Sequence, residues 1–245
     1  MSVHFNGTTD KLSWTGQLLS AYPYTVFCWI KPSATGTSEI AVDIGKNDLT
    51  EGAARIYYSA SGPEIRSSII SGSTSYICST AVDADPSNWQ PVMMICTSAT
   101  DRRIYYKTTS FTGTETTNIT PSFASTNRVV VGVAMDGSSL PWAGDIAELW
   151  VWSVARSSSD FTTLAGDTKP EVAFSSNIVE GWTLSTGGAD QVGFVSRTLT
   201  ATGTSTGATH PITRSGGSGP VTVAASGSAS TGGIGTQAPG ISIGL

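Results

Sequence analysis

The stretch 129–156 reads VVVGVAMDGSSLPWAGDIAELWVWSVAR. An apolar segment ends at Gly132, a polar loop follows, and a Trp-Ala-Gly step leads into a second apolar segment. Two β-rich segments joined in this way indicate a twisted antiparallel sandwich. The apolar positions change parity between Ile146 and Leu149, which indicates either a bulge near Ala147 or a strand buried on both faces.

Short β-rich segments recur along the chain, separated by Gly, Ser, Asn, Asp or Pro. This rhythm is typical of an all-β, antiparallel two-sheet sandwich. Alternation in 25–31 puts Val26 and Cys28 on one face and Phe27 and Trp29 on the other, so this strand should be central and covered on both sides. The expected strands are 3–5, 25–31, 39–44, 54–59, 64–70, 75–80, 89–97, 103–108, 128–133, 146–153, 178–184 and 197–201.

Residues 157–164 (SSSDFTTL) predict one short helical turn. A serine can cap its first turn, and Phe161 and Leu164 can pack against the sandwich. It is expected to be the only helix.

Composition excludes several classes of protein. The 245 residues are 39% apolar and 13% charged, which suits one main domain. The net charge is −5 and no basic run exceeds Arg102-Arg103, so a nucleic-acid groove is not expected. No apolar stretch approaches the roughly 18 to 20 residues that span a bilayer, and the residues after Met1 do not resemble a secretory signal. The expectation is synthesis in a cytoplasm without membrane insertion.

Cysteine and histidine usage argues against metal binding. Cys28, Cys78 and Cys96 are odd in number and lie in apolar contexts without C-x-x-C spacing, so buried thiols are expected. The two histidines, His4 and His210, lie at opposite ends of the chain. We therefore expect no zinc and no cofactor.

The composition changes near Gly203, after which Gly, Ser, Thr and Ala dominate. We divide the chain into a sandwich, 1–205, and a low-complexity C-terminal arm, 206–245. Its apolar steps can add as strands to the edge of a neighbour's sheet, and the alternative is that the arm folds back over its own sandwich. The arm residues expected to make these contacts are Val221, Val223, Ile234, Ile241, Ile243 and Leu245.

Five segments in order carry a family resemblance: FNGTTDKLSW, YTVFCWIKPS, SNWQPVMMIC, RRIYYK and the stretch 129–164. Together they resemble the concanavalin A-like lectin/glucanase superfamily, in particular its laminin G-like jelly rolls. The resemblance covers about 3–205 and implies two curved sheets of six or seven strands, with a concave face that many relatives use for glycans.

One departure concerns a carboxylate that relatives often carry after the isoleucine of the G-x-I step, where this chain has Ala147 followed by Glu148. Calcium-binding relatives use carboxylates at loop ends, but no dense acidic loop supplies the six to eight oxygens that calcium needs. The available carboxylates are Asp43, Asp48, Asp136 and Asp145.

Glucanases of this superfamily carry an E-x-D-x-x-E strand, since retaining hydrolysis needs two carboxyls about 5 Å apart. The chain has no such pattern, and the nearest approaches are Glu39/Asp43 and Asp145/Glu148. The odd spacing of the second pair puts its members on opposite sides of a regular strand. We therefore predict that the protein is not an enzyme.

Aromatic side chains in polar loops are candidates for stacking on sugar rings. The alternative for Trp142 is that it plugs one end of the sandwich. Trp89, Trp150, Trp152 and Trp182 lie on apolar strands and are expected in the core. The glycan-binding candidates are Trp14, Tyr22, Tyr24 and Trp142.

Jelly rolls of this superfamily recur in tailed-phage structural proteins, and 178–211 resembles the closing region of such chains. The leading prediction is a non-enzymatic phage virion protein, a capsid decoration or head-fibre protein anchored by its arm. Its partners would be other virion proteins or copies of itself, as a dimer or trimer. The alternative is a carbohydrate-binding adhesin that recognises cell-surface glycans, in a tail fibre or free. A third interpretation is a cell-encoded laminin G-like adhesion module.

Overall fold

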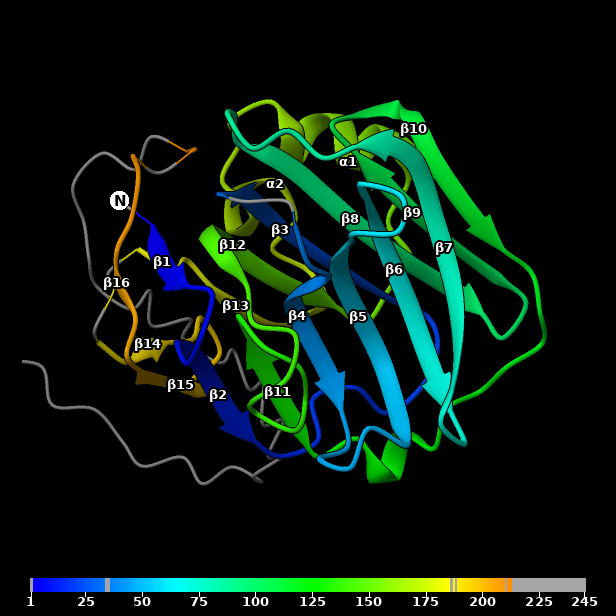
Figure 1. Ribbon diagram of the computed structural model, residues 1–245. Coiled ribbons are helices and arrows are strands. Elements are labelled where there is room, and N and C mark those ends of the chain that lie inside the picture. Colours follow the sequence, from blue (N-terminus) through cyan, green and yellow to red (C-terminus); the bar gives the residue numbers. More distant parts are fainter. Residues whose placement is uncertain (1, 34–35, 186, 188, 210, 213–245) are drawn as a thin grey trace, which may run out of the picture.

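The computed structural model describes residues 2–33, 36–185, 187, 189–209 and 211–212. In this part of the chain, two antiparallel β-sheets of eight strands each pack face to face (Figure 1). The predicted all-β, two-sheet sandwich is confirmed. The sheets are one or two strands wider than the resemblance implied.

The first sheet, sheet A, is organised around its central strand. β12 pairs with β3 along most of its length, with β1 through its first half and with β13 through its second half. In spatial order the strands are β10 (Thr108–Glu115), β9 (Asp101–Tyr106), β8 (Gln90–Ser98), β3 (Tyr24–Pro32), β12 (Ala143–Trp152), β1 (Val3–Asn6) and β16 (Ser205–Thr206), with β13 (Ile178–Trp182) beside β12.

The second sheet, sheet B, combines strands from both ends of the chain with a meander from its middle. Four consecutive strands, β4 to β7, are joined by short connections and lie at the front of Figure 1. In spatial order the strands are β14 (Gln191–Val192), β15 (Thr198–Thr202), β2 (Lys11–Thr15), β11 (Arg128–Val131), β4 (Glu39–Gly45), β5 (Glu51–Ser59), β6 (Glu64–Ser71) and β7 (Thr74–Asp83).

The main apolar core, the inner cluster, fills the space between the two sheets. Val26 and Cys28 of β3 meet Val42 and Ile44 of β4 there. Phe27 points to the other side of sheet A, so the alternation predicted for this strand is confirmed. Burying both faces of β3 fixes it at the centre of its sheet.

A second apolar layer, the outer cluster, covers the far face of sheet A. It contains Phe27, Trp150 and Trp152 from the sheet and Phe161 and Leu164 from α1 (Ser158–Ala165). Figure 1 shows both helices on this side of the molecule, behind sheet A. Sheet A is therefore covered on both faces.

The predicted helix at 157–164 is confirmed, with its serine cap. Ser157 Oγ accepts the N–H of Asp160, and the Asp160 carboxylate accepts the N–H of Ser157. The expectation that this is the only helix is wrong. A four-residue helix, α2 (Pro170–Ala173), begins at a proline, which is pre-organised for a first helical position, and a single 3₁₀ turn, η1, spans Phe123–Ser125.

The parity change after Ile146 has both of its proposed causes. The register of β12 against β3 shifts between Ala147 and Trp150, and Glu148 has a positive φ of 57°. The strand is also buried on both faces from Gly144 to Trp152. The bulge lets Leu149 face the inner cluster while Trp150 faces the outer one.

The chain crosses from sheet B to the edge of sheet A after β15. Gly207 N–H donates to Ser2 O at 2.9 Å, and Trp89 Nε1 donates to Thr209 O at 2.8 Å. Ile212, only 1% exposed, belongs to the outer cluster. The packed body thus continues past the predicted boundary at 205, and the predicted arm contacts lie outside the described residues: Val221, Val223, Ile234, Ile241, Ile243 and Leu245.

The three cysteines are buried free thiols, as predicted. Burial raises the pKa of each of them. No helix among the described residues is long and apolar enough to cross a membrane.

Candidate functional site

Two of the predicted glycan-binding aromatics are buried. Trp142 and Tyr24 are both 0% exposed and belong to the inner cluster. The Trp142 backbone is bonded on both sides, to Gly7 and to Gly132. Neither ring has a free face for a sugar, so the prediction that Tyr24 and Trp142 bind glycans is wrong. Trp142 instead plugs the sandwich, which was its alternative role.

The other two predicted aromatics, Trp14 and Tyr22, are half-buried and contact other side chains of the protein. Tyr22 stacks on Tyr24 with ring centroids 5.6 Å apart and donates its hydroxyl to Ile119 O at 2.9 Å. Trp14 packs against the inner cluster, and the guanidinium of Arg197 lies 5.2 Å from its ring centroid. No ring contact between described residues joins Trp14 to the tyrosine pair.

In the part of the chain that the structure describes, no helix packs on the outer side of β4 to β7, and we call this side the open face (Figure 1). Side chains alternate along a strand, and Ile56 and Tyr58 belong to the inner cluster, so Arg55 and Tyr57 project from the open face. Its members are Asp43, Arg55, Tyr57, Glu64, Arg66, Ser68, Ile70, Ile77 and Ser79.

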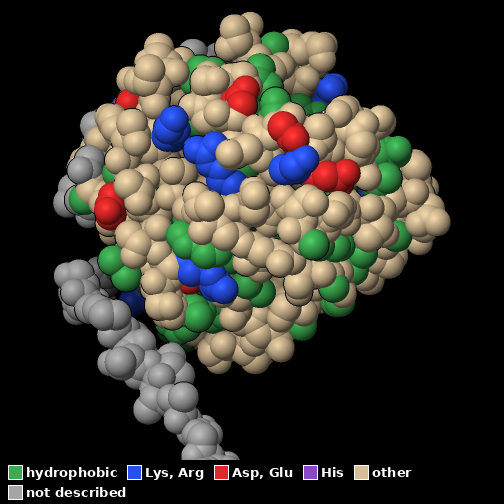
Figure 2. Space-filling view, turned by 90° about the horizontal axis from the view of Figure 1, so that it is seen from below, with side chains coloured by type: hydrophobic (Ala, Val, Ile, Leu, Met, Phe, Trp, Pro, Cys, Tyr) green, Lys and Arg blue, Asp and Glu red, His purple; other side chains and the backbone are tan. Residues whose placement is uncertain are grey.

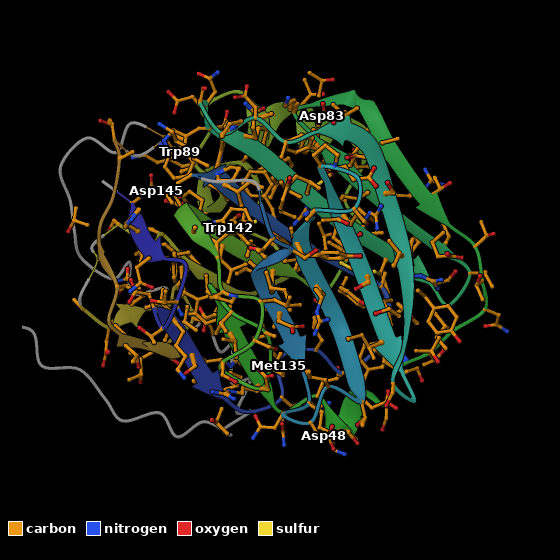
Figure 3. All side chains as sticks on the ribbon, in the orientation of Figure 1. Asp48, Asp83, Trp89, Met135, Trp142 and Asp145 are labelled. Atoms are coloured by element: carbon orange, nitrogen blue, oxygen red, sulfur yellow. The ribbon has the colours of Figure 1, made fainter. Side chains whose placement is uncertain are left out.

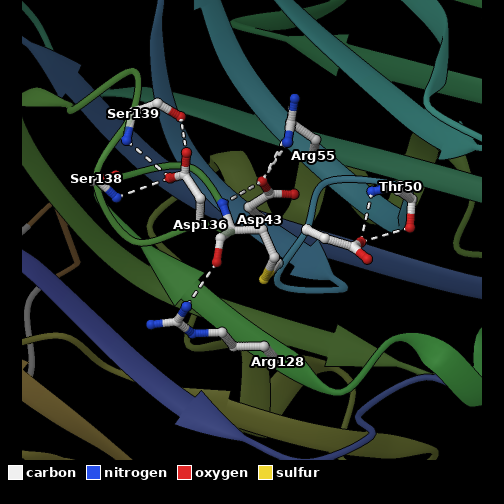
Figure 4. A network of polar contacts seen from close by, with 9 residues as sticks. Asp43, Thr50, Arg55, Arg128, Asp136, Ser138 and Ser139 are labelled. Carbon is white, nitrogen blue, oxygen red and sulfur yellow. Dashed lines mark hydrogen bonds and ion pairs between the residues drawn. The ribbon is translucent and has the colours of Figure 1, made fainter.

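Register brings Asp43 of β4 and Arg55 of β5 side by side. Arg55 donates to Asp43 Oδ2 from Nη2 at 2.6 Å and from Nε at 3.1 Å, and the Met135 N–H donates to the same oxygen at 3.0 Å (Figure 4). The Asp43 side chain is 1% exposed and that of Arg55 is 13% exposed. Burial raises the pKa of Asp43, although Arg55 and Met135 lower it.

A second ion pair on the open face joins Glu64 and Arg66, both on β6. Arg66 of β6 is opposite Tyr57 of β5 and Ser79 of β7, and it donates to Glu64 Oε1 from Nε at 2.7 Å. The pKa of Glu64 lies below its usual value because hydrogen bonds from Ser79 and Arg66 outweigh the effect of burial. Tyr57, half-buried, thus lies beside a guanidinium that an ionised carboxylate holds in place.

One side of the open face is bordered by the loop between β11 and β12. Ile40 N–H donates to Leu140 O at 2.9 Å, which fastens the loop to β4. Asp136 Oδ1 accepts the N–H groups of Ser138 and Ser139, each at 2.9 Å (Figure 4). The carboxylate of Asp136 therefore shapes the loop itself.

Glu39, at the start of β4, is buried under the end of the same loop. It is 3% exposed, and its Oε2 accepts the N–H of Ala143 at 3.0 Å. Burial raises the pKa of Glu39 to about 7, although this hydrogen bond lowers it. The group titrates near neutrality at a site that links β4 to β12.

The four carboxylates considered for calcium have separate partners. Asp48 pairs with Lys46, and Asp145 lies 3.1 Å from His4 Nδ1. Figure 3 shows Asp48 at the lower end of the sandwich and Asp145 near β1, far from it. Asp43 and Asp136 are held as described above, and no group of three or more metal-binding side chains occurs among the residues described.

The carboxylates considered as catalytic pairs likewise bind separate groups. Glu39 binds the Ala143 backbone, while Asp43 binds Arg55. The bulge breaks the regular alternation assumed for Asp145 and Glu148, and the Glu148 carboxylate accepts the indole N–H of Trp150 at 2.6 Å.

Two hollows of about 210 and 310 Å³ lie beside α1 on the sheet A side. The aromatic residues that line them, Tyr105 and Phe161, are 6% and 0% exposed. Arg103, in the first hollow, is already paired with Asp101. The two hollows offer little aromatic surface on which a sugar could stack, so the open face is the better candidate for a glycan site. Figure 2, which views the lower end of the sandwich, shows acidic and basic groups interspersed among neutral ones.

The sequence reasoning did not select Arg55, Tyr57, Glu64 or Arg66. The signal was present in ARIYYS and EIRSSII, where charged or aromatic residues alternate with buried ones. Alternation of this kind predicts which side chains share a face. It does not show that this face lacks a covering layer, which here depends on where the helices pack.

Comparisons with known proteins agree with the fold. A family model described as the concanavalin A-like lectin/glucanases superfamily matches residues 6–161, well over half of the chain. No curated protein matches the sequence.

Three solved structures are similar at low identity. Domain 4 of a GH43 extracellular arabinanase from Geobacillus stearothermophilus, in complex with arabinotriose, is 21% identical with a TM-score of 0.53, over 66% of this chain and 75% of that one. The Ruminococcus gnavus IT-sialidase CBM40, bound to α2,3 sialyllactose, is 12% identical with a TM-score of 0.53, over 67% and 96%. A carbohydrate-binding protein, described as putative, from Bacteroides ovatus is 15% identical with a TM-score of 0.59, over 87% and 62%. At these identities the similarity concerns the fold.

Proposed function

Because the chain belongs to the concanavalin A-like lectin/glucanase superfamily, we propose that it is a non-catalytic carbohydrate-binding module. Its glycan site is the open face of sheet B. Structures of similar fold that hold arabinotriose or sialyllactose support the carbohydrate-binding role.

The observation that carries the proposal is the arrangement of Tyr57 beside two fixed guanidinium groups. Sugars are bound by aromatic rings that cover their apolar faces and by planar polar groups that bond pairs of hydroxyls. Arg55 and Arg66 are each held by a carboxylate, which reduces the conformational entropy they lose on binding. Tyr57 and Arg66 are direct cross-strand neighbours.

The same pairing argues for binding without catalysis. Retaining hydrolysis needs one carboxyl as nucleophile and a second that carries a proton. On the open face Glu64 has a lowered pKa and is bound to Arg66, while Asp43 is almost fully buried under Arg55. Neither is free to take up the acid role.

Replacing Tyr57 by alanine is expected to weaken glycan binding by about tenfold, the loss of about 1.4 kcal/mol of stacking. The measurement is calorimetric titration with the best ligand found on a glycan array. Tyr76→Ala is the matched control, because Tyr76 is also half-buried but lies opposite Ile69, which faces the inner cluster. Equal loss in both variants, or none in either, would count against the open face.

For the biological setting, we propose a phage capsid decoration or head-fibre protein. Ile212 packs in the outer cluster, on the sheet A side, so an arm leaving there would hold the module with its open face outward. Removal of 213–245 should then abolish particle association and leave glycan affinity unchanged. Mass spectrometry of purified particles that detects none of this chain would contradict the virion role.

A further inference from the structure

Two cations from neighbouring strands converge on one glycine at the edge of the open face. Lys11 Nζ donates to Gly137 O at 2.8 Å, and Arg128 Nη1 donates to Met135 O at 2.7 Å. A Cβ placed on Gly137 would lie 3.2 Å from both Lys11 Nζ and Arg128 Nη2. The two positive groups thus flank the same small space, which the lack of a side chain at Gly137 leaves open.

Neither cation has a carboxylate partner among the ion pairs of the described residues. The carboxylate nearest in sequence to Gly137 is that of Asp136, which is bonded to Ser138 and Ser139. The two side chains donate to neutral acceptors, namely two backbone carbonyls and the Asn47 amide oxygen. Like charges this close repel each other, so a shared anion would relieve the repulsion.

The space flanked by Lys11 and Arg128 at Gly137 adjoins the proposed glycan site. Arg128 is opposite Gly45 on β4, and Val130 is opposite Asp43, which itself pairs with Arg55. Adjacent strands lie about 4.8 Å apart, so β11 and β5 are separated by about 10 Å across the sheet. The arginines of the open face are neutralised by Asp43 and Glu64, whereas Lys11 and Arg128 are not.

We propose that Lys11 and Arg128 bind an anionic group of the glycan, a carboxylate or a sulfate, over Gly137. The ligand class is therefore an acidic glycan whose neutral part lies on the open face. This inference rests on the proposed function. Lys11 keeps two ammonium donors for the anion, and Arg128 keeps its Nη2 donors.

The experiment compares matched glycan pairs, each a neutral oligosaccharide and its sulfated, sialylated or uronic acid derivative, by affinity measurement on the full chain. The acidic member should bind about tenfold more tightly, as one charge-assisted contact implies. This preference should shrink as salt is raised from about 0.05 to about 0.5 M, in keeping with screening at roughly 10 Å or less.

The variants are Lys11→Gln and Arg128→Lys, with Arg103→Gln as a control on the far sheet. Lys11→Gln should reduce the preference to about twofold or less and leave the neutral ligand unaffected, while Arg128→Lys should keep most of it because the charge remains. Arg103→Gln should change nothing. Equal binding of both members by the unmodified chain, or a preference that survives Lys11→Gln, overturns this inference alone. Binding of neither member contradicts the proposed function as well.

Discussion

Replacing Arg55 by methionine is expected to lower the free energy of unfolding by about 3 to 5 kcal/mol at pH 8. The cause is Asp43, whose side chain is 1% exposed and would remain as a buried charge without its cation. Only the Met135 N–H would still bond it. Since the carboxyl can take up a proton instead, the loss should be smaller at pH 4. Urea unfolding at the two pH values measures both effects.

Two further variants show whether burial of the charge is the cause. Asp43→Asn combined with Arg55→Met should recover much of the loss, because the uncompensated charge is gone. Arg103→Met breaks an arginine–aspartate pair at the surface, where the side chains are 47% and 37% exposed, and should cost less than about 1 kcal/mol. Similar losses for Arg55→Met and Arg103→Met would contradict the account of the open face.

Replacing Glu39 by glutamine is expected to stabilise the protein relative to the unmodified chain, and this gain should be roughly 3 kcal/mol larger at pH 8 than at pH 4. Burial raises the pKa of Glu39 from its reference value of 4.5 to about 7. Between pH 4.5 and about pH 7, Glu39 therefore keeps its proton in the folded state and has lost it in the unfolded state. Stability that is fully present below pH 4.5 is lost as the pH rises to about 7, and a glutamine side chain has no such loss.

The measurement is the difference in unfolding free energy between Glu39→Gln and the unmodified chain at intervals from pH 4 to pH 8. Other groups titrate in both proteins, so the difference isolates Glu39. Glutamine retains an oxygen that can accept the Ala143 N–H. A difference that is flat with pH would show that Glu39 is solvated in the folded protein.

The fold was predictable where burial is periodic. Alternation in 25–31 identified β3 as a central strand, and the parity change after Ile146 located the bulge of β12. The helix α1 followed from its capping serine and two apolar residues one turn apart. In each case the local pattern and the packing agree, which is why the sequence sufficed there.

Other elements were missed because their pattern is weak. The strand β10 reads TTSFTGTE, with few apolar residues, and it is held as an edge strand by pairing with β9. The strand β2 alternates only at Leu12 and Trp14. Such strands form because a neighbouring strand offers its backbone, and this partner is not visible in the local sequence.

Two of the glycan candidates, Tyr24 and Trp142, are buried for a related reason. Trp142 follows proline in a polar loop, a context typical of exposed residues, yet the loop folds so that its ring enters the inner cluster. Conversely, the pairs Asp43–Arg55 and Glu64–Arg66 depend on the register of β4 to β6. Register is set by turns and core packing across the whole sheet, so neither ion pair could be predicted from the residues alone.

Amide chemical-shift mapping of the full chain, with the glycan that binds best on an array, would locate the glycan site. The glycan site proposed for the open face predicts that the largest changes fall on β4, β5 and β6 around Arg55 and Tyr57, with no change around α1. Changes confined to the hollows beside α1, or to the surroundings of Trp14 and Tyr22, would contradict it.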